Sequence, residues 1–304
     1  MKVKSRKSAK RRSFVNANLP IPDLTNDVRA FIQNLGDSPR ERYLKDQAWS
    51  KFVSSETDPP SLRKQRAIDK WLAQEEINAE TNVRLAFTPE DFHILPRVSY
   101  ADFMAFFTSL VETTIGAVPT FPDNGGFSGG ASTSRKRTES APALKFTGQA
   151  HITARASGLI ESTMETISPV WADLVNPDEY LVPHESNTLF TVPKNTTIDR
   201  CACKEPDINM FLQKGLGNQI RRALRRVGVN LNDQSVNQRL ARKGSADGSL
   251  ATLDLSSASD SVTWELVFQV MPLAWFTLLD SSRSEVTVIG DEEHVNEMFS
   301  SMGN

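Results

Sequence analysis

The sequence has little of several residue types that mark common classes of protein. Its 304 residues include two cysteines and four histidines. Cys201 and Cys203 are too close in sequence for an ordinary disulfide and lack the paired Cys/His spacing of a zinc site, which fits a reducing compartment. The histidines are scattered without an HExxH or similar pattern, so we expect structural or surface roles for them rather than metal binding.

Long apolar runs and a large charge of one sign are also missing. No apolar stretch approaches the roughly 20 residues of a membrane-spanning helix. The most apolar segment, FMAFFTSLVETTIGAV, is interrupted by Glu112 and predicts a core helix. Because the formal net charge is −2, any nucleic-acid binding must come from local basic clusters. The remaining composition, 39% hydrophobic and 24% charged, is that of an ordinary globular chain long enough for two domains.

The amino-terminal half contains one basic arm, one helical region and one loop. Residues 1–13 are densely basic without the apolar stretch of a secretory signal, and form either a polycationic arm or a solvated tail. Residues 14–120 are predicted to be mostly helical, with breaks at GDSPRE, TDPPS and LPRVS. Residues 121–143 form a Gly/Ser-rich loop with a basic triplet. This loop lacks the GK[ST] of a P-loop, so a mobile surface connection is favoured over a phosphate cradle.

The segment LFTVPKNTTIDRCAC predicts a β-hairpin from residue 189 onward, with two short β-prone runs around a Pro-Lys-Asn-Thr turn. Lys194 and Arg200 flank its bend. Two cations on one hairpin are suited to a triphosphate. They are equally typical of edge strands, where charge discourages aggregation.

Three helices are predicted around this region. The first has Asp207 as its expected N-cap and ends near Gly228, with leucine and isoleucine at intervals of four residues. A shorter helix is predicted from Asp233 to Gly244, and another after Asp260 with a break at Pro272. The polar face of the first helix is suited to RNA phosphates or is simply a solvated face. Its cations are Arg221, Arg222, Arg225 and Arg226.

The stretch GSLATLDLSSASDSV places a carboxylate in a run that alternates like a strand. The alternation predicts a half-buried strand with Asp254 on its polar face. A carboxylate at the end of a strand suits a divalent metal in phosphoryl or nucleotidyl transfer, and the serines that follow leave room for a substrate. Asp260 either contacts another part of that substrate or caps the helix beginning near Val262. The spacing D-x₅-D by itself is weak evidence for a catalytic pair, because aspartate is also common in turns and helix caps.

Several long motifs in this order closely resemble the replicase catalytic subunit of leviviruses, the small positive-strand RNA phages of bacteria. They are VPKNTTIDR, CKEPDINMFLQKGLG, LNDQSVNQRLARKGSADGSLATLDLSSASDSV and the terminal FSSMGN. The loop GGASTSRKRTESAPALK is also similar, while the amino-terminal third matches only loosely. The resemblance implies an RNA-directed RNA polymerase of α+β class with the right-hand arrangement of fingers, palm and thumb. Fingers would occupy 144–247, and 248–304 would be a partial palm.

The resemblance also implies roles for individual residues. Asp254 matches the metal-binding aspartate of the first palm motif and is therefore the expected catalytic residue, with Mg²⁺ in a two-metal site. Asp260 matches a residue near the incoming ribose. Lys194 and Arg200 fall in the basic fingers motif that contacts the nucleoside triphosphate. Ser301 and Asn304 lie in the beginning of the second palm motif, near the template and the sugar.

The implied partners are a single-stranded RNA template, ribonucleoside triphosphates and the host translation elongation factors Tu and Ts, with no membrane. The implied location is the cytoplasm of the infected bacterial host.

The chain departs from the family because a Gly-Asp-Asp hairpin, the rest of the palm and the thumb are missing. Gly290-Asp291 is followed by Glu292 and precedes the second palm motif, so we reject it as that hairpin. We therefore expect a fragment that is inactive alone. A non-catalytic RNA-binding module is the alternative. A metal nuclease ranks last, because it needs a further acidic cluster.

Overall fold

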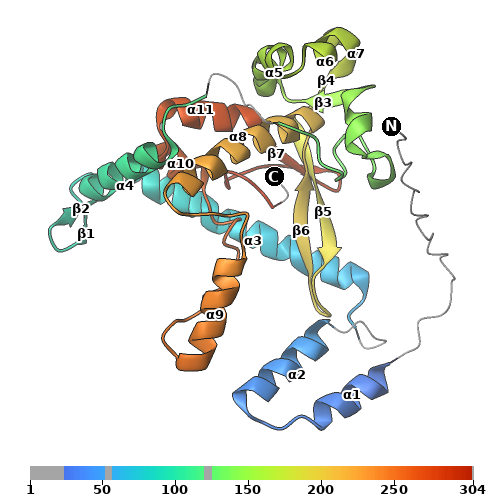
Figure 1. Ribbon diagram of the computed structural model, residues 1–304, viewed down its shortest axis with the longest axis vertical. Helices are drawn as coiled ribbons and strands as arrows, with labels where there is room; N and C mark the ends of the chain where they lie inside the picture. Colours follow the sequence, from blue (N-terminus) through green and yellow to red (C-terminus); the bar gives the residue numbers. More distant parts are fainter. Residues whose placement is uncertain (1–23, 52–56, 120–124, 303–304) are drawn as a thin grey trace, which may run out of the picture. The chain divides into compact units, whose positions relative to one another are not determined.

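The computed structural model describes residues 24–51, 57–119 and 125–302 of an α+β protein (Figure 1). The chain divides into two compact units. One contains α1 (Thr25–Gln33) and α2 (Pro39–Lys51), together with the turn Asn195–Thr197. Within this unit, Thr196 N donates to Ser50 O at 2.8 Å. The other unit contains the remaining elements. The basic arm 1–13 lies outside the described residues.

The second unit begins with two long helices separated by a small hairpin. They are α3 (Pro60–Phe87), β1 (His93–Leu95), β2 (Val98–Ser99) and α4 (Tyr100–Ile115). With α1 and α2, these helices make the described part of the region 14–120 mostly helical, and the hairpin β1–β2 is an addition to the predicted helices. Ser99 and Asp102 form a capping box that fixes the start of α4.

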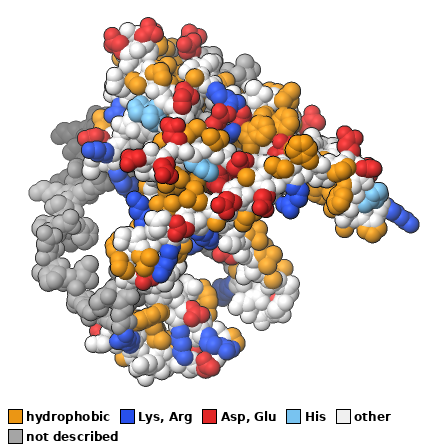
Figure 2. Space-filling view, turned by 180° about the vertical axis from the view of Figure 1, so that it is seen from behind, with side chains coloured by type: hydrophobic (Ala, Val, Ile, Leu, Met, Phe, Trp, Pro, Cys, Tyr) orange, Lys and Arg blue, Asp and Glu red, His pale blue; other side chains and the backbone are white. Residues whose placement is uncertain are grey.

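The helix predicted from the most apolar segment exists, but it is not a core helix. Phe103, Phe106 and Leu110 of α4 are 43%, 69% and 52% exposed, whereas Ile115 in the last turn is buried. Figure 2 shows hydrophobic side chains along this arm of the molecule. The prediction was wrong because an apolar sequence favours burial but does not supply a neighbouring element. Burial of α4 would require other elements of the fold to pack against its apolar side chains.

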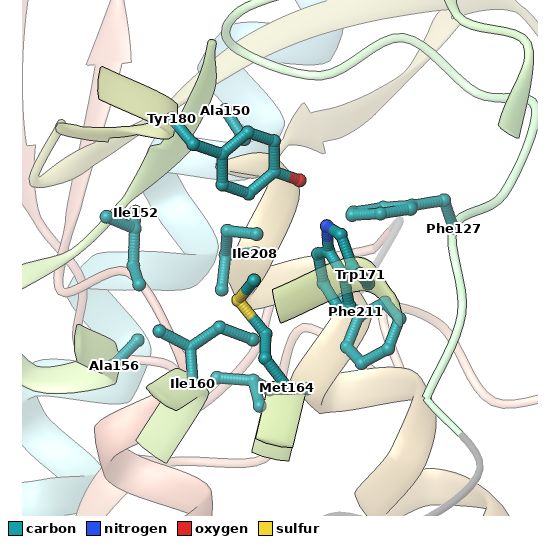
Figure 3. Packing of buried hydrophobic residues seen from close by; sticks show 11 residues of the cluster. Phe127, Ala150, Ile152, Ala156, Ile160, Met164, Trp171, Tyr180, Ile208 and Phe211 are labelled. Carbon is teal, nitrogen blue, oxygen red and sulfur yellow. The ribbon is translucent and has the colours of Figure 1, made fainter. Parts of the chain in front are cut away.

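The largest core lies between a short parallel sheet and α8 (Asp207–Arg226) (Figure 3). The sheet joins β3 (Ala150–Ile152) to β4 (Leu181–Pro183), with α5 (Ala154–Ile167), α6 (Pro169–Leu174) and α7 (Pro177–Tyr180) between them. Ile208, Phe211 and Leu212 of α8 enter this core beside Trp171. The apolar face of α8, predicted from the four-residue spacing of its apolar side chains, therefore packs into the core.

The glycine-rich loop is packed against α8 over the part that the structure describes, 125–146, so the expectation of a surface connection was wrong. Phe127 is buried in the core. Ser132 and Ser134 donate to the Asp207 carboxylate at 2.6 and 2.5 Å. Asp207 is the first residue of α8, so these hydrogen bonds hold the loop against the helix. The predicted N-cap was wrong, because Pro206 occupies that position and not Asp207. Two 3₁₀ turns, Arg137–Glu139 and Pro142–Phe146, complete the loop.

A four-stranded sheet with the order β6-β5-β7-β8 carries the predicted hairpin. Its strands are β5 (Ser186–Pro193), β6 (Asp199–Lys204), β7 (Val286–Ile289) and β8 (Glu292–Val295). The strands β5 and β6 are antiparallel, β5 and β7 parallel, and β7 turns tightly into β8 at Gly290-Asp291. α3 packs across β5 and β6 (Figure 1). Cys201 and Cys203 on β6 are free thiols, as expected.

The remaining helices are α9 (Ser235–Asp247), α10 (Trp264–Val270) and α11 (Leu273–Ser282). The predicted end of α8 at Gly228 (φ +89°) and the break at Pro272 are confirmed. The predicted end of α9 at Gly244 was wrong. This helix continues to Asp247, and Gly248 (φ +68°) is its C-cap. A Cβ on Gly244 would lie 2.4 Å from Leu250 O, so Gly244 permits a close approach of the backbone instead. None of the described helices is long and apolar enough to cross a membrane.

Candidate active site

A pocket of about 490 Å³ brings together four of the residues that the sequence singled out: Lys194, Arg200, Asp254 and Asp260. It lies between α3, the β5–β6 hairpin and the segment 254–260. These segments are far apart in the chain, and the fold alone makes them neighbours. Both carboxylates therefore face the same space as the hairpin cations.

Asp260 is half buried, and burial raises the pKa of its carboxyl above the usual value. The Glu75 charge adds to the rise. A hydrogen bond of 3.0 Å from Ser259 Oγ and the charges of Lys70 and Arg200 oppose it. Asp260 does not cap the following helix, because Thr263 is the N-cap of α10 and accepts from Leu266 N at 3.4 Å. The alternative role left open by the sequence is thus excluded.

The hairpin is held against α3 by a buried ion pair. Arg63 Nε lies 3.2 Å from Asp199 Oδ1, with both side chains about one-tenth exposed or less. Thr191 Oγ1 on the neighbouring strand also donates to this carboxylate, at 3.2 Å. Asp199 is buried and the next residue, Arg200, is exposed, and both line the pocket.

α3 supplies a third cation that no motif marked. Lys70 lines the pocket, and its Nζ lies 3.4 Å from Ser256 Oγ in the serine run. With Lys194 and Arg200 it makes three cations around a pocket that Asp199, Asp254 and Asp260 also line. The region 14–120 gave no sequence signal for this role, because a single exposed lysine on a helix is ordinary.

α3 also fixes the loop that carries Asp260. Asn78 Nδ2 donates to Asp260 O and to Glu75 Oε1, both at 2.8 Å. Glu75 is 2% exposed and also accepts from the backbone N–H groups of Glu297 and Met298 at 2.7 and 3.0 Å. His294 Nε2 lies 2.9 Å from the same carboxylate. The buried side of α3 follows the four-residue spacing of Arg63, Ala67, Trp71 and Glu75, a pattern that could have revealed it.

The strand predicted around Asp254 is not formed. Residues 249–255 have irregular backbone, and Leu253 and Leu255 are 87% and 73% exposed. The alternation is real, but a strand needs a neighbour for its backbone hydrogen bonds, and none of the sheets of the described residues includes this segment. Asp254 nonetheless lines the pocket.

The structure does not bring the other described site residues to this pocket. Ser301 is 7% exposed and does not line the pocket, although its neighbour Met302 does. Asn304 lies outside the described residues. The four arginines of α8 are exposed elsewhere, at Arg221, Arg222, Arg225 and Arg226.

The pocket fits one part of a magnesium site. Asp254 has no hydrogen bond or ion pair with the part of the chain that the structure describes, so its oxygens are available to a cation. Mg²⁺ in nucleotide sites is held by one or two carboxylates together with substrate phosphates. Among residues 24–51, 57–119 and 125–302, no group of three or more acidic, histidine or cysteine side chains could hold a metal alone. The described residues therefore offer carboxylates such as that of Asp254 to a metal ion, but no complete metal site.

Carboxylates and cations around one pocket in an α+β fold define a site suited to a charged nucleotide. The chain belongs to the RNA replicase beta-chain family, whose model matches residues 13–304. The family thus includes the amino-terminal third, which the motifs had matched only loosely. The resemblance to levivirus replicases is confirmed.

Relatives from several phages support the same assignment. The chain is 48% identical to the RNA-directed RNA polymerase beta chain of Enterobacteria phage fr over 180 residues, 59% of this chain and 33% of that one. It is 37% identical to the RNA-directed RNA polymerase subunit beta of Enterobacteria phage SP over 293 residues, 94% of this chain and 48% of that one. For Escherichia virus Qbeta the identity is 36% over 277 residues, 88% and 44% of the two chains. The chain spans about half the length of the curated relatives it matches.

Proposed function

We propose that this chain forms the nucleotide-binding part of an RNA-directed RNA polymerase, the catalytic subunit of a phage replicase that copies viral RNA in the infected bacterium. The observation that carries the proposal is the pocket in which Asp254 and Asp260 face Lys194, Arg200 and Lys70. Residues 144–247 would be fingers and 248–304 part of a palm in a right-hand arrangement. The substrates are ribonucleoside triphosphates and a single-stranded RNA template. On the resemblance alone, we include elongation factors Tu and Ts as partners of the whole replicase.

Each residue of the pocket has a distinct task in this proposal. Lys194 and Arg200 bind the triphosphate, whose negative charge their exposed side chains attract. Asp260, held by α3, is placed to hydrogen-bond the ribose. Asp254 would hold Mg²⁺, which when bound stabilises the charge on the attacking and leaving oxygens.

A binding measurement tests the proposal without requiring polymerisation. Isothermal titration calorimetry should show that the chain binds UTP, and that Mg²⁺ strengthens this binding while uridine binds far more weakly. The second candidate is a non-catalytic RNA-binding module, which the lack of a complete metal cluster in the described residues favours. A chain that binds single-stranded RNA but no UTP would establish that candidate instead.

Lys70→Met is expected to weaken UTP binding about tenfold, because it removes a cation that faces the phosphates. The loss should be smaller for UMP and absent for uridine, since those ligands carry less phosphate charge. Calorimetry with the three ligands measures it. Lys64→Met is the matched control, because Lys64 is an exposed lysine of the same helix outside the pocket. Equal effects of the two variants would show that Lys70 acts only through general charge.

Asp260→Ala is expected to reduce the preference for ATP over 2′-deoxyATP by about tenfold or more. A site that hydrogen-bonds a hydroxyl discriminates against an analogue lacking it, and the 2′-hydroxyl separates RNA from DNA precursors. Calorimetry with both nucleotides measures the preference. The melting temperature should change little, because Thr263 caps α10. An unaltered preference would exclude Asp260 from ribose recognition.

A further inference from the structure

A second hollow, of about 350 Å³, lies along α8 and shares no lining residue with the active-site pocket. One wall is the outward face of α8, including Lys214, Gly217 and Arg221. The other is the glycine-rich loop at Gly126 and Ser128. We call this hollow the α8 groove.

The groove exists because one face of α8 is buried in the core and the opposite face is exposed to solvent. Phe211, Leu212 and Leu216 point into the core. Lys214, Gly217 and Arg221 follow one another at intervals of three and four residues, which places them on a common face. Since the core occupies the opposite side, this face is turned to solvent, and the fastened loop beside it makes the face concave.

The charged side chains of the groove are all cations. Lys214 and Arg221 are its charged lining residues, and no carboxylate lines it. Lys214 is exposed and has no hydrogen bond or ion pair with the described residues. Arg221 Nη1 makes one weak contact, 3.3 Å from Asn232 Oδ1. Both side chains are therefore available to an anionic ligand.

Glycine at position 217 keeps the groove open. A glycine inside a helix costs about 1 kcal/mol relative to alanine. A Cβ on Gly217 would meet nothing within 4 Å, so packing does not require the glycine. On the facing loop, a Cβ on Gly126 would lie 3.2 Å from Lys214 Nζ and crowd the ammonium. Both glycines leave space for a ligand beside Lys214.

We propose that the α8 groove binds the phosphodiester backbone of single-stranded RNA at a site separate from the nucleotide pocket. The proposal rests on the polymerase function proposed above. Seven residues along a helix separate Lys214 from Arg221 by about 10 Å. This spacing is wider than one phosphate group spans, so the two cations match different phosphates of a chain rather than a single anion. Backbone contacts of this kind are independent of sequence.

A change of shape without change of charge tests the groove directly. Gly217→Leu should fill it and weaken binding of a fluorescein-labelled oligouridylate by about tenfold or more, measured by fluorescence anisotropy. The melting temperature should stay equal or rise, because leucine favours the helix. Gly158→Leu is the matched control, since Gly158 is an exposed glycine of α5 whose Cβ would also meet nothing. Its RNA affinity should equal that of the unmodified chain.

A charge variant provides the second arm. Lys214→Gln should flatten the dependence of log affinity on log salt by about 0.7, the value for one lost phosphate contact to a single strand. Lys64→Gln should leave the slope unchanged. Unchanged RNA binding in both Gly217→Leu and Lys214→Gln would overturn the proposal.

Two further readouts distinguish RNA binding in the groove from nucleotide binding. Displacement of the oligouridylate by UTP at equal phosphate concentration would show that free nucleotides occupy the groove, and would also overturn the proposal. Calorimetric UTP binding should be the same in Gly217→Leu as in the unmodified chain. If the unmodified chain bound no UTP while the groove variants still lost RNA, the polymerase function would fail and the groove would stand.

Discussion

Asp254→Asn is expected to reduce nucleotide incorporation by more than about a hundredfold while leaving RNA affinity within about twofold. Changes to residues that merely orient a metal ligand cost about 10 to 100-fold, so loss of a ligand should cost more. RNA affinity depends on phosphate contacts that do not involve this carboxylate. Incorporation is measured in a replicase that carries these residues together with the additional length of the curated relatives. In the present chain, the same variant should abolish the Mg²⁺ dependence of UTP binding.

Asp291→Asn is the matched control for this experiment. Asp291 follows Gly290 in the β7–β8 turn and does not line the pocket, so incorporation should be unaffected. This control also tests the rejection of Gly290-Asp291 as a metal-binding element. Incorporation near the unmodified level in Asp254→Asn would remove Asp254 from the metal site. Loss in Asp291→Asn instead would relocate that site to the turn.

Glu75→Ala is expected to lower the free energy of unfolding by about 3–5 kcal/mol. The buried carboxylate accepts hydrogen bonds from the Glu297 and Met298 backbones and from Asn78, and His294 lies beside it. Removing it leaves buried donors without an acceptor, and each such group costs about 1–3 kcal/mol. Urea denaturation followed by circular dichroism measures the change.

Two variants define what Glu75 contributes. Glu75→Gln keeps one acceptor oxygen and should lose less stability than Glu75→Ala. Glu76→Ala changes the exposed neighbour on α3 and should alter the free energy of unfolding by less than about 0.5 kcal/mol. Loss of the Asn78 contact should also weaken UTP binding in Glu75→Ala, since Asn78 holds the loop at Asp260. A free energy of unfolding within about 1 kcal/mol of the unmodified chain would contradict this role.

Local patterns in the sequence were sufficient to place the principal elements. The β-prone runs on either side of the Pro-Lys-Asn-Thr turn became β5 and β6, because both partners of that pairing lie within one short segment. Four-residue spacing of apolar side chains predicted α8, and Gly228 and Pro272 ended helices as their backbone preferences require. Two of the motifs that carried the family resemblance, VPKNTTIDR and CKEPDINMFLQKGLG, lie in these same elements.

Local patterns failed where an outcome depended on a distant segment. The alternating stretch around Asp254 has the side-chain pattern of a strand, yet no described strand pairs with it. The apolar α4 formed as a helix but remained largely exposed. Asp207 was expected to cap its own helix, and instead two serines 73 and 75 residues earlier in the chain bind its carboxylate. In each case the missing information was the identity of the neighbour.

The sequence by itself determined the hairpin cations, the aspartates 254 and 260 and the family, because each of these is encoded in contiguous residues. Only the tertiary structure decided that these groups share one pocket, that Lys70 joins them and that Asn78, 182 residues away, supports Asp260. The α8 groove likewise appears only when the glycine-rich loop is fastened beside the helix. The physical reason is that contacts between distant segments are fixed by packing of the whole chain, whereas local spacing reports only which face of an element is apolar.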